Sequence, residues 1–441
     1  MKTYNFNYIV LVLALGLSFQ GVAQQVIKPS DAISLALEHN YGIKIANNNV
    51  EIAANNKDIL NSGFLPTLTG NAGATYNRDN ISAEFTNGES TTLNGATSSR
   101  YNAGLSLNYT LFDGFGRRYD YKRLKEEYNL TALQARATIE NTITQLLTVY
   151  YDVARRSENL KSLEETLKIS KDRLTRAEYQ FEYGQNTKLD VLNAEVDINN
   201  DSINSINIEQ SLINAKRNLN FVTGNTIDNE FVVDTTVAFL IQLNKDELLD
   251  KLYINNVTLI QNEKNIAINE FTLKANKSGY LPTIGLTGAY GWNENNNNAA
   301  AFVAVSSNTG LSGGLNLTWN LFDGGGTITR VKNAQINLEN QKLEKDQLKL
   351  DVTRNFNNAW DDYQNKLRIF DVQKSNIKTA KNNFLRTKEK FKLGQATSIE
   401  FRQAQLNLLS AELNKNQAKY DAKLAEVLVL QISGELLNVE F

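Results

Sequence analysis

The chain has 441 residues with 46 Lys and Arg against 48 Asp and Glu, and its net charge of −2 argues against nucleic acid as a partner. It has no Cys and a single His, His39, so neither a disulfide framework nor a metal site is expected. No carboxylate pair stands beside a Ser or His in a catalytic arrangement. We therefore expect no cofactor and no enzyme activity.

Residues 1–23 have the layout of a secretory signal peptide. Lys2 precedes a short apolar run, and small residues ending at Ala23 provide a cleavage site. A permanent membrane helix is the alternative, but an apolar run of about ten residues is too short to span a bilayer. We expect export from the cytoplasm and a mature chain that begins near Gln24.

Residues 30–61 have apolar positions at helical spacing, with Ser30 placed to cap the first turn. The period changes to two at 66–78 and 100–112, where apolar residues alternate with Asn, Thr, Ser and Gly. Alternation over about ten residues suits a tilted transmembrane strand. A soluble β-sandwich is the alternative, but small uncharged polar partners and aromatic residues near the strand ends favour the membrane. The connection at 78–100 is expected to be polar and irregular.

A long helix without Pro is predicted at 115–183. An apolar seam along its lower half, at alternating spacings of three and four, includes Ser170. At about 68 residues the helix would be about 100 Å long, more than a globular core uses. The return helix at 187–222 carries two apolar seams, as expected of a helix that packs on neighbours at both sides, whereas an ordinary buried helix is the alternative. Its remaining polar face, with Asn193 and Asp201, is interpreted as wet.

The chain then repeats its own motifs. Leu-Phe-Asp-Gly at 111–114 returns at 321–324, and Gly-Gln at 184–185 returns at 394–395, about 210 positions later. This duplication predicts two copies of one structural unit: repeat 1 at 24–223, an equatorial segment at 224–243 and repeat 2 at 244–441. Repeat 2 is expected to hold a helix at 244–277, strands at 282–293 and 309–322 joined by a polar connection at 294–309, a long helix at 326–393, a return helix at 397–432 and a short C-terminal tail.

Four strands per chain cannot close a barrel with a lumen. No stretch after the N-terminus is long and apolar enough to span as a helix, so membrane crossing would require a closed β-barrel. An open sheet edge is not tolerated in lipid, because its backbone polar groups would lack partners. Strands from several chains must therefore pool, and three chains would give about twelve.

In their order and in both copies, these motifs resemble those of TolC-family outer membrane efflux proteins. The resemblance covers nearly the whole mature chain, including Phe64-Leu65-Pro66 and Tyr280-Leu281-Pro282 before the first strand of each pair. It implies a mixed α and β membrane protein: a homotrimer whose 12-stranded β-barrel, with four strands per chain, crosses the outer membrane lipid and continues into a long periplasmic α-helical barrel. It also implies a tripartite efflux or type I secretion system, in which a periplasmic adaptor protein links the duct to an inner-membrane pump of RND type or ABC type.

The resemblance further implies a gate at the periplasmic tips of the helical hairpins. The acidic-ring positions fall at Glu400 and Gln403, with first-copy counterparts at Asp190 and Asn193. Three carboxylates converging on a narrow pore would favour cations. The family's restraining Tyr and Arg positions are occupied by Phe391 and Ala396, so the closed state must be held differently or less firmly. The alternative for Glu400 is a solvated residue near the start of a helix.

Two further groups of residues are assigned by the resemblance. The hairpin tips, where an adaptor would dock, contain Gly184, Gln185, Thr187, Gly394, Gln395 and Thr397. The junction between barrel and tunnel contains Pro66, Asp113, Gly114, Gly116, Pro282, Asp323, Gly324 and Gly326. Its glycines lack the third Gly of a dinucleotide-binding loop and follow an amphipathic strand, so we expect them to bend the chain.

Two other functions remain as alternatives to a gated, passive export duct. A trimeric coiled-coil surface protein with a β-barrel anchor would carry its strands as one set at one end, which the duplication contradicts. A stand-alone diffusion porin would have no use for long periplasmic helices. An export channel is therefore the preferred interpretation.

Overall fold

The computed structural model describes residues 26–226, 230–240 and 243–441. The predicted signal peptide at 1–23 lies outside these residues. The chain divides into two compact units, each assembled from separate stretches of sequence. Unit 1 comprises Met1–Ala46, Ala135–Val257 and Lys349–Phe441, and unit 2 comprises Asn47–Gln134 and Thr258–Leu348.

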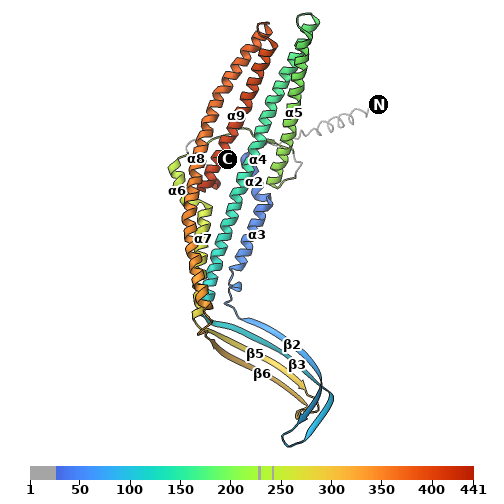
Figure 1. Cartoon of the computed structure of the whole chain (residues 1–441), viewed down its shortest axis with the longest axis vertical. Helices are drawn as coiled ribbons and strands as arrows, with labels where there is room; N and C mark the ends of the chain where they lie inside the picture. Colours follow the sequence, from blue (N-terminus) through green and yellow to red (C-terminus); the bar gives the residue numbers. More distant parts are fainter. Residues whose placement is uncertain (1–25, 227–229, 241–242) are drawn as a thin grey trace, which may run out of the picture. The chain divides into compact units, whose positions relative to one another are not determined.

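Unit 2 contains an antiparallel sheet of four strands in the order β2-β3-β5-β6 (Figure 1). The strands are β2 (Thr67–Glu84), β3 (Ser90–Asp113), β5 (Thr283–Asn296) and β6 (Val305–Thr318). The first hairpin corrects the expectation of an irregular connection at 78–100, because most of that segment is paired strand with one register shift between Asp79 and Ile81. Its Thr-rich sequence suits strands, whose backbone pairing does not depend on apolar side chains. In the second hairpin, likewise, only 297–304 lies outside the strands.

The register of the sheet gathers its apolar residues on one face. Leu105 pairs with Tyr290, and Tyr290 pairs with Leu311, so that the three side chains form one row across three strands. All three are exposed. Their neighbours along the strands, which include Ser106 and Ser312, point to the other face because side chains alternate along a strand. The sheet is therefore amphipathic, with an uncovered apolar face.

Two predicted helices are broken, each at an asparagine. The helix expected at 30–61 is α2 (Pro29–His39), α3 (Tyr41–Asn56) and a 3-10 turn (Ile59–Asn61), and the helix expected at 244–277 is α6 (Lys245–Asn255) and α7 (Val257–Lys277). The breaks lie at Asn40 and Asn256, both with extended backbone. The Asn40 side chain donates to the carbonyl of Val222 at 2.8 Å, and that of Asn256 donates to the carbonyl of Ile432 at 2.9 Å. Each break therefore supplies a hydrogen-bond partner to a distant helix end, where carbonyls are otherwise unpaired.

The long helices form two antiparallel hairpins of equal dimensions. Helices α4 (Gly116–Glu182) and α8 (Gly326–Lys392) have 67 residues each. The return helices α5 (Lys188–Thr223) and α9 (Ser398–Ser433) have 36 residues each. Both return helices end at a glycine in the left-handed conformation, Gly224 and Gly434, which favours glycine because it has no Cβ.

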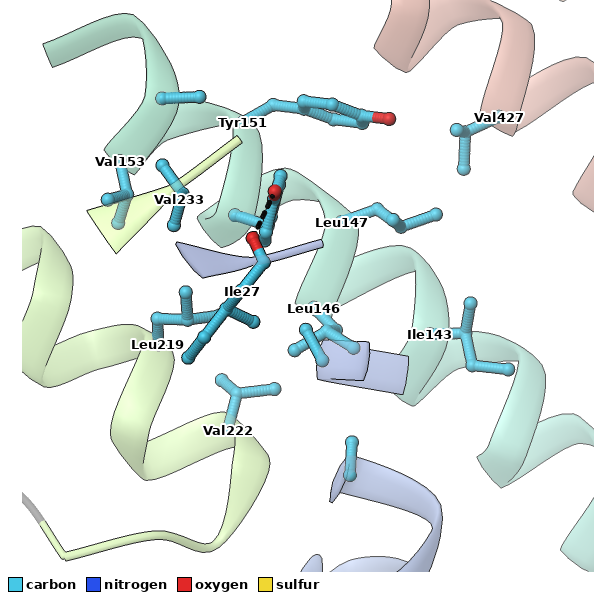
Figure 2. Close-up of a cluster of buried hydrophobic side chains, with 14 of the residues drawn as sticks. Ile27, Ile143, Leu146, Leu147, Tyr151, Val153, Leu219, Val222, Val233 and Val427 are labelled. Atoms are coloured by element: carbon cyan, nitrogen blue, oxygen red, sulfur yellow. Dashed lines mark hydrogen bonds between the residues drawn. The ribbon is translucent and has the colours of Figure 1, made fainter. Parts of the chain in front are cut away.

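The main apolar core of unit 1 surrounds the middle of α4 (Figure 2). Leu146, Leu147 and Tyr150 of this helix are fully buried. They pack against a two-stranded parallel sheet of β1 (Val26–Ile27) and β4 (Val232–Val233), the latter from the segment predicted to be equatorial. The Tyr150 hydroxyl lies 2.8 Å from the carbonyl oxygen of Ile27. This core fixes α4 to both return helices, which contribute residues such as Leu219 and Leu430.

Candidate gate at the helix tips

Both hairpins reverse direction through a glycine with positive φ. Gly184 has φ of +69° and Gly394 has φ of +71°, and a Cβ added at either would meet no atom within 4 Å. The N–H of the following residue, Gln185 or Gln395, donates to a carbonyl five residues earlier, at 2.7 and 2.8 Å respectively. This is a common way to end a helix, and it requires the left-handed conformation at the glycine. The glycines set the geometry of the turns, and their outer surface is open.

The predicted gate acids begin the two return helices as members of capping boxes. The Thr397 N–H donates to the Glu400 carboxylate at 2.8 Å, and the Glu400 N–H donates to Thr397 Oγ1 at 3.2 Å. Thr187 and Asp190 form the corresponding box, with 3.2 Å from the Thr187 N–H to the carboxylate. The hydrogen bond from the Thr397 backbone lowers the pKa of the Glu400 carboxyl below its usual 4.5. Glu400 therefore stays ionised at neutral pH, exposed at the start of α9.

The structure brings three of the four predicted gate residues together. A cavity of about 320 Å³ lies between the starts of α5 and α9, lined by Arg173, Asp190, Asn193, Val196, Asp197, Ser398, Ile399, Arg402 and Gln403. Glu400 is absent from this lining. The Glu400 carboxylate is instead held by the Thr397 cap at the first turn of α9.

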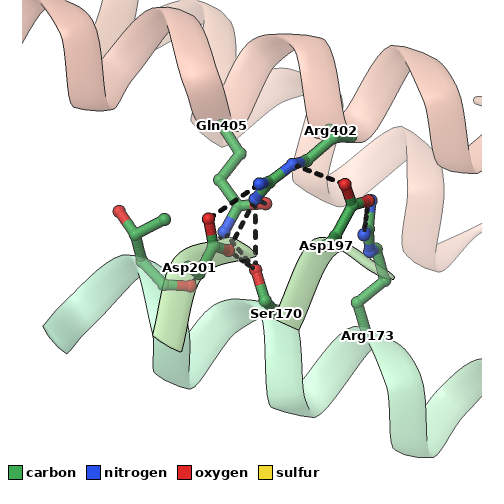
Figure 3. A network of polar contacts seen from close by, with 7 residues as sticks. Ser170, Arg173, Asp197, Asp201, Arg402 and Gln405 are labelled. Carbon is green, nitrogen blue, oxygen red and sulfur yellow. Dashed lines mark hydrogen bonds and ion pairs between the residues drawn. The ribbon is translucent and has the colours of Figure 1, made fainter. Parts of the chain in front are cut away.

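A buried polar network beside this cavity was not foreseen from the sequence (Figure 3). The guanidinium of Arg402 in α9 donates to both carboxylate oxygens of Asp201 in α5, at 2.7 and 2.8 Å. The Ser170 hydroxyl of α4 donates to the same carboxylate at 2.6 Å. Gln405 donates to Ser170 Oγ at 3.0 Å and to the carbonyl of Thr166 at 2.9 Å. Residues of α4, α5 and α9 are thereby joined through one carboxylate.

Burial makes this carboxylate dependent on its partners. Asp201 is only 1% exposed, so the interpretation of its position as part of a wet face is wrong. A buried charge is stable only when it is paired and hydrogen-bonded, and here the Arg402 fork and Ser170 meet that need. The sequence feature that pointed to this network was Ser170, a polar residue within an otherwise apolar seam. In the structure Ser170 is fully buried. A polar seam residue requires a polar partner, but the sequence did not identify which one.

A second ion pair extends the network toward the tip. Arg173 of α4 pairs with Asp197 of α5, one helical turn before Asp201, and Arg402 Nε lies 3.4 Å from Asp197 Oδ1. Arg173 is buried, whereas Asp197 is about one quarter exposed. The first hairpin and α9 are thus connected by two adjacent carboxylates that share one arginine.

Phe391, at the expected restraint position, makes apolar contacts instead of hydrogen bonds. Its ring stacks on Phe401 with 4.8 Å between centroids. The guanidinium of Arg176 from α4 lies over the other hairpin's Phe391 at 5.1 Å, and it donates to the carbonyl of Lys392 at 2.9 Å. Stacking and cation–π contacts of this kind each contribute about 1 kcal/mol. Phe391 therefore joins the two hairpins by packing.

In unit 2, the predicted junction residues order the starts of the long helices. The Asp113 carboxylate accepts hydrogen bonds from the backbone N–H of Arg117 at 2.8 Å and from its Nε at 3.1 Å. Asp323 accepts from the backbone N–H of Thr327 at 2.8 Å. Gly114 has φ of +68°, and a Cβ there would lie 2.6 Å from the carbonyl oxygen of Ser278, so this glycine is required by both conformation and space.

In the described ranges, no group of three or more His, Cys, Asp or Glu side chains is placed to hold a metal ion. Among the described helices, none is both long enough and apolar enough to cross a membrane.

Comparison with known proteins identifies the family. The sequence model for "Outer membrane efflux protein" matches residues 32–225 and 248–435. The chain is 22% identical to the outer membrane efflux protein BepC of Brucella suis biovar 1 (strain 1330), over 96% of this chain and 89% of BepC. It is 25% identical to the outer membrane protein TolC of Vibrio cholerae serotype O1, over 69% of this chain and 70% of TolC.

Solved structures share the fold of this chain. The fold is similar to that of the Campylobacter jejuni CmeC outer membrane channel, with a TM-score of 0.77 at 18% identity, over 92% of this chain and 86% of CmeC. The expected mixture of long helices and strands is thus confirmed as a fold shared with outer membrane channels. Because the family match spans most of the sequence, the chain belongs to the outer membrane efflux proteins, the family of TolC, and is located in the outer membrane with an extension into the periplasm.

Proposed function

We propose that the chain assembles as a homotrimer and forms a gated, passive duct for export across the periplasm and outer membrane. In this proposal a periplasmic adaptor protein and an inner-membrane pump of RND or ABC type supply cargo and energy. The cargo would be small molecules or proteins. The observation that carries the proposal is the amphipathic four-stranded sheet, with its uncovered apolar face and two free edges.

The free edges support pooling of strands from several chains. Strands β2 and β6 each have one neighbour in the sheet, so the outer edge of each presents unpaired backbone groups. Such edges are unstable in lipid, but β6 of one copy beside β2 of the next would pair both. Three copies would then close about twelve strands into a barrel with the apolar face outward.

The helices support the same assembly. One apolar seam of α5 is covered within the chain, through Val191, Ala194 and Leu219. The other is exposed and comprises Leu189, Leu192, Val196, Ile203, Ile206 and Ile213. An uncovered apolar stripe of this length is typical of a protein interface. We assign it to contact with a neighbouring copy in the helical barrel.

The polar network and the packing of Phe391 are proposed to hold the duct closed. Opening requires the α8–α9 hairpin to move relative to the α4–α5 hairpin, and Arg402, Asp201 and Phe391 join these two hairpins. Glu400 would form an acidic ring in the trimer, and Asp190, Asn193 and Gln403 would lie beside the constriction. The duplication proposed for the sequence is supported by the equal lengths of corresponding helices.

Oligomeric state is the direct test. The protein, extracted from outer membranes in mild detergent, should migrate as a heat-dissociable trimer on an unboiled gel and have the mass of three chains. A folded monomer in the same fraction would refute the assembly. A trimer that supports export without any adaptor or pump would instead favour a diffusion porin.

A further inference from the structure

A groove in unit 2 has features of a phosphate-binding site that the duct itself does not require. Its volume is about 480 Å³, and it is lined by Ala54, Lys57, Asp58, Ile59, Tyr121, Lys125, Glu126, Tyr128 and Asn129. These residues come from the end of α3, the segment that follows it and the first turns of α4. We call it the lysine–tyrosine groove.

The two lysines of the groove are held by aromatic rings. Lys57 Nζ lies 3.0 Å from the centroid of the Tyr128 ring, and Lys125 Nζ lies 4.3 Å from that of Tyr121. Neither ammonium forms an ion pair with a carboxylate in the described parts of the chain. A ring orders an ammonium group but leaves its N–H donors free for an anion. The groove therefore presents two ordered cations with unused donors.

The carboxylates of the groove already have partners. Glu126 is paired with Lys264 at 3.1 Å. Asp58 accepts the backbone N–H of Leu60 at 2.8 Å, where it caps a 3-10 turn. Neither carboxylate is paired with Lys57 or Lys125, so both ammonium groups keep N–H donors for an anionic group. A phosphate is suitable because its several oxygens can accept hydrogen bonds from two ammonium groups at once.

Exposed apolar residues lie next to the groove on the side of the sheet. Ile59 lines the groove, and the adjacent Leu60 is 76% exposed. Phe64, which leads into β2, contacts the ring of Tyr121 edge to face at 6.0 Å. On the second hairpin, Phe322 is 87% exposed just before α8 begins. Exposed apolar residues therefore occur between the sheet and the helix starts, and the groove begins about 8 Å beyond the start of α4.

A layer of cations and aromatic rings just beyond an apolar band is the arrangement that a membrane interface favours. We propose that the lysine–tyrosine groove binds the phosphate of a phospholipid headgroup in the periplasmic leaflet, with Ile59 and Leu60 against the start of the acyl chains. This inference rests on the proposed insertion of the sheet in the outer membrane. Lipid bound here would fix the height of the helices relative to the bilayer.

The test is lipid binding to the full-length protein purified in detergent, followed by native mass spectrometry. Added phosphatidylethanolamine should bind the Lys57→Gln/Lys125→Gln double variant about tenfold more weakly than the wild type, because two lysine–phosphate contacts are lost. The Lys57→Arg/Lys125→Arg variant should retain binding. Lys374→Gln is the matched control, because the Lys374 ammonium also lies over an aromatic ring, 4.2 Å from the centroid of Phe370 in unit 1. This variant should bind the lipid as the wild type does.

Soluble glycerophosphoethanolamine separates a lipid site from a site for free phosphate esters. It should bind at least tenfold more weakly than the lipid, because it lacks acyl chains. Equal binding of the two, or lipid binding that the glutamine pair does not change, would overturn the inference. All variants are extracted from the outer membrane fraction. A variant that is extracted normally but loses lipid binding therefore tests the groove alone. A protein that is absent from the outer membrane fraction would instead contradict the proposed function.

Discussion

Arg402 and Asp201 form a bidentate ion pair between α9 and α5, with both terminal guanidinium nitrogens within 2.8 Å of a carboxylate oxygen. The pair connects the two hairpins within one chain, although its members are 201 positions apart. The side chain of Asp201 is 2% exposed and that of Arg402 is 12% exposed, so water screens the pair only weakly. Its contribution can be tested with variants that remove one of the two charges and with a variant that replaces both side chains by apolar ones.

Asp201→Asn should lower stability more than Asp197→Asn. The first variant leaves Arg402 facing a neutral partner in a buried site, at a cost of about 3 to 5 kcal/mol. The second leaves the buried Arg173 without its carboxylate, but the Asp197 side chain is about one quarter exposed, so water reaches this site and the expected cost is smaller, about 1 to 3 kcal/mol. Thermal unfolding of the purified protein measures the difference. Equal costs would mean that the network is solvated in the assembled protein.

Replacing the pair by apolar residues should open the resting channel without loss of the fold. An Arg402→Met/Asp201→Leu variant removes both charges together, and such replacements of buried ion pairs are often neutral or stabilising. If the pair restrains the hairpins, planar-bilayer recordings should give a higher resting conductance than the wild type. An unchanged conductance in a stable trimer would assign the restraint to the packing of Phe391.

Glu400→Gln should remove charge from the gate while keeping the helix cap. Glutamine serves as well as glutamate at this position of a capping box, so the start of α9 should be preserved. Cation preference and block by multivalent cations should both decrease in single-channel recordings, and trimer yield should not change. Glu389→Gln is the control, because it removes another exposed tip carboxylate. Equal effects of the two variants would place the constriction elsewhere.

Leu107→Arg should impair assembly by about 2 to 4 kcal/mol if Leu107 faces the middle of the bilayer. Asn108→Arg should be mild, because the next residue along a strand points to the opposite face. Leu107 pairs with Leu68 on the same face of the sheet as Leu105, whereas Asn108 pairs with Thr67. The yield of trimer in the outer membrane fraction measures the contrast. If both substitutions were tolerated equally, the apolar face of the sheet would not contact lipid.

Gly394→Leu should abolish export while leaving the trimer in the membrane. The positive φ makes this substitution cost about 1 to 2 kcal/mol, which a long hairpin can absorb, but the side chain would project from the proposed adaptor-docking surface. Gly394→Asn, which tolerates this conformation better, should retain more export. Drug-susceptibility and trimer assays on the same strains provide the measurement. Loss of the trimer would assign the glycine to folding.

Apart from the hairpin at 78–100, whose strands are adjacent in the sequence, the expectations that the structure changed concern long-range partners. Asn40 and Asn256 end helices that look continuous, because an internal Asn costs a helix only a few tenths of a kcal/mol relative to most residues. Their side chains gain hydrogen bonds to Val222 and Ile432, which are distant in sequence. The residues that line the candidate gate also depend on partners that are distant in the sequence. Asp190, Asn193 and Gln403 were identified by resemblance, but Arg402 was not, because its partner lies in the other half of the chain.

Local periodicity by itself determined the elements of this protein: the strands alternate with period two, the long helices lack proline, and Gly184 and Gly394 mark the turns. These signals act over a few residues, where backbone sterics and the burial of one face are decisive. Only the tertiary structure decided which polar residue is buried. Asp201 follows the exposed Asn199 and Asn200 in the sequence and becomes the centre of a buried network, because folding brings Arg402 and Ser170 to within hydrogen-bonding distance of it. A charge can be buried only where its partners meet it, and that condition is set by packing between segments that the sequence does not place side by side.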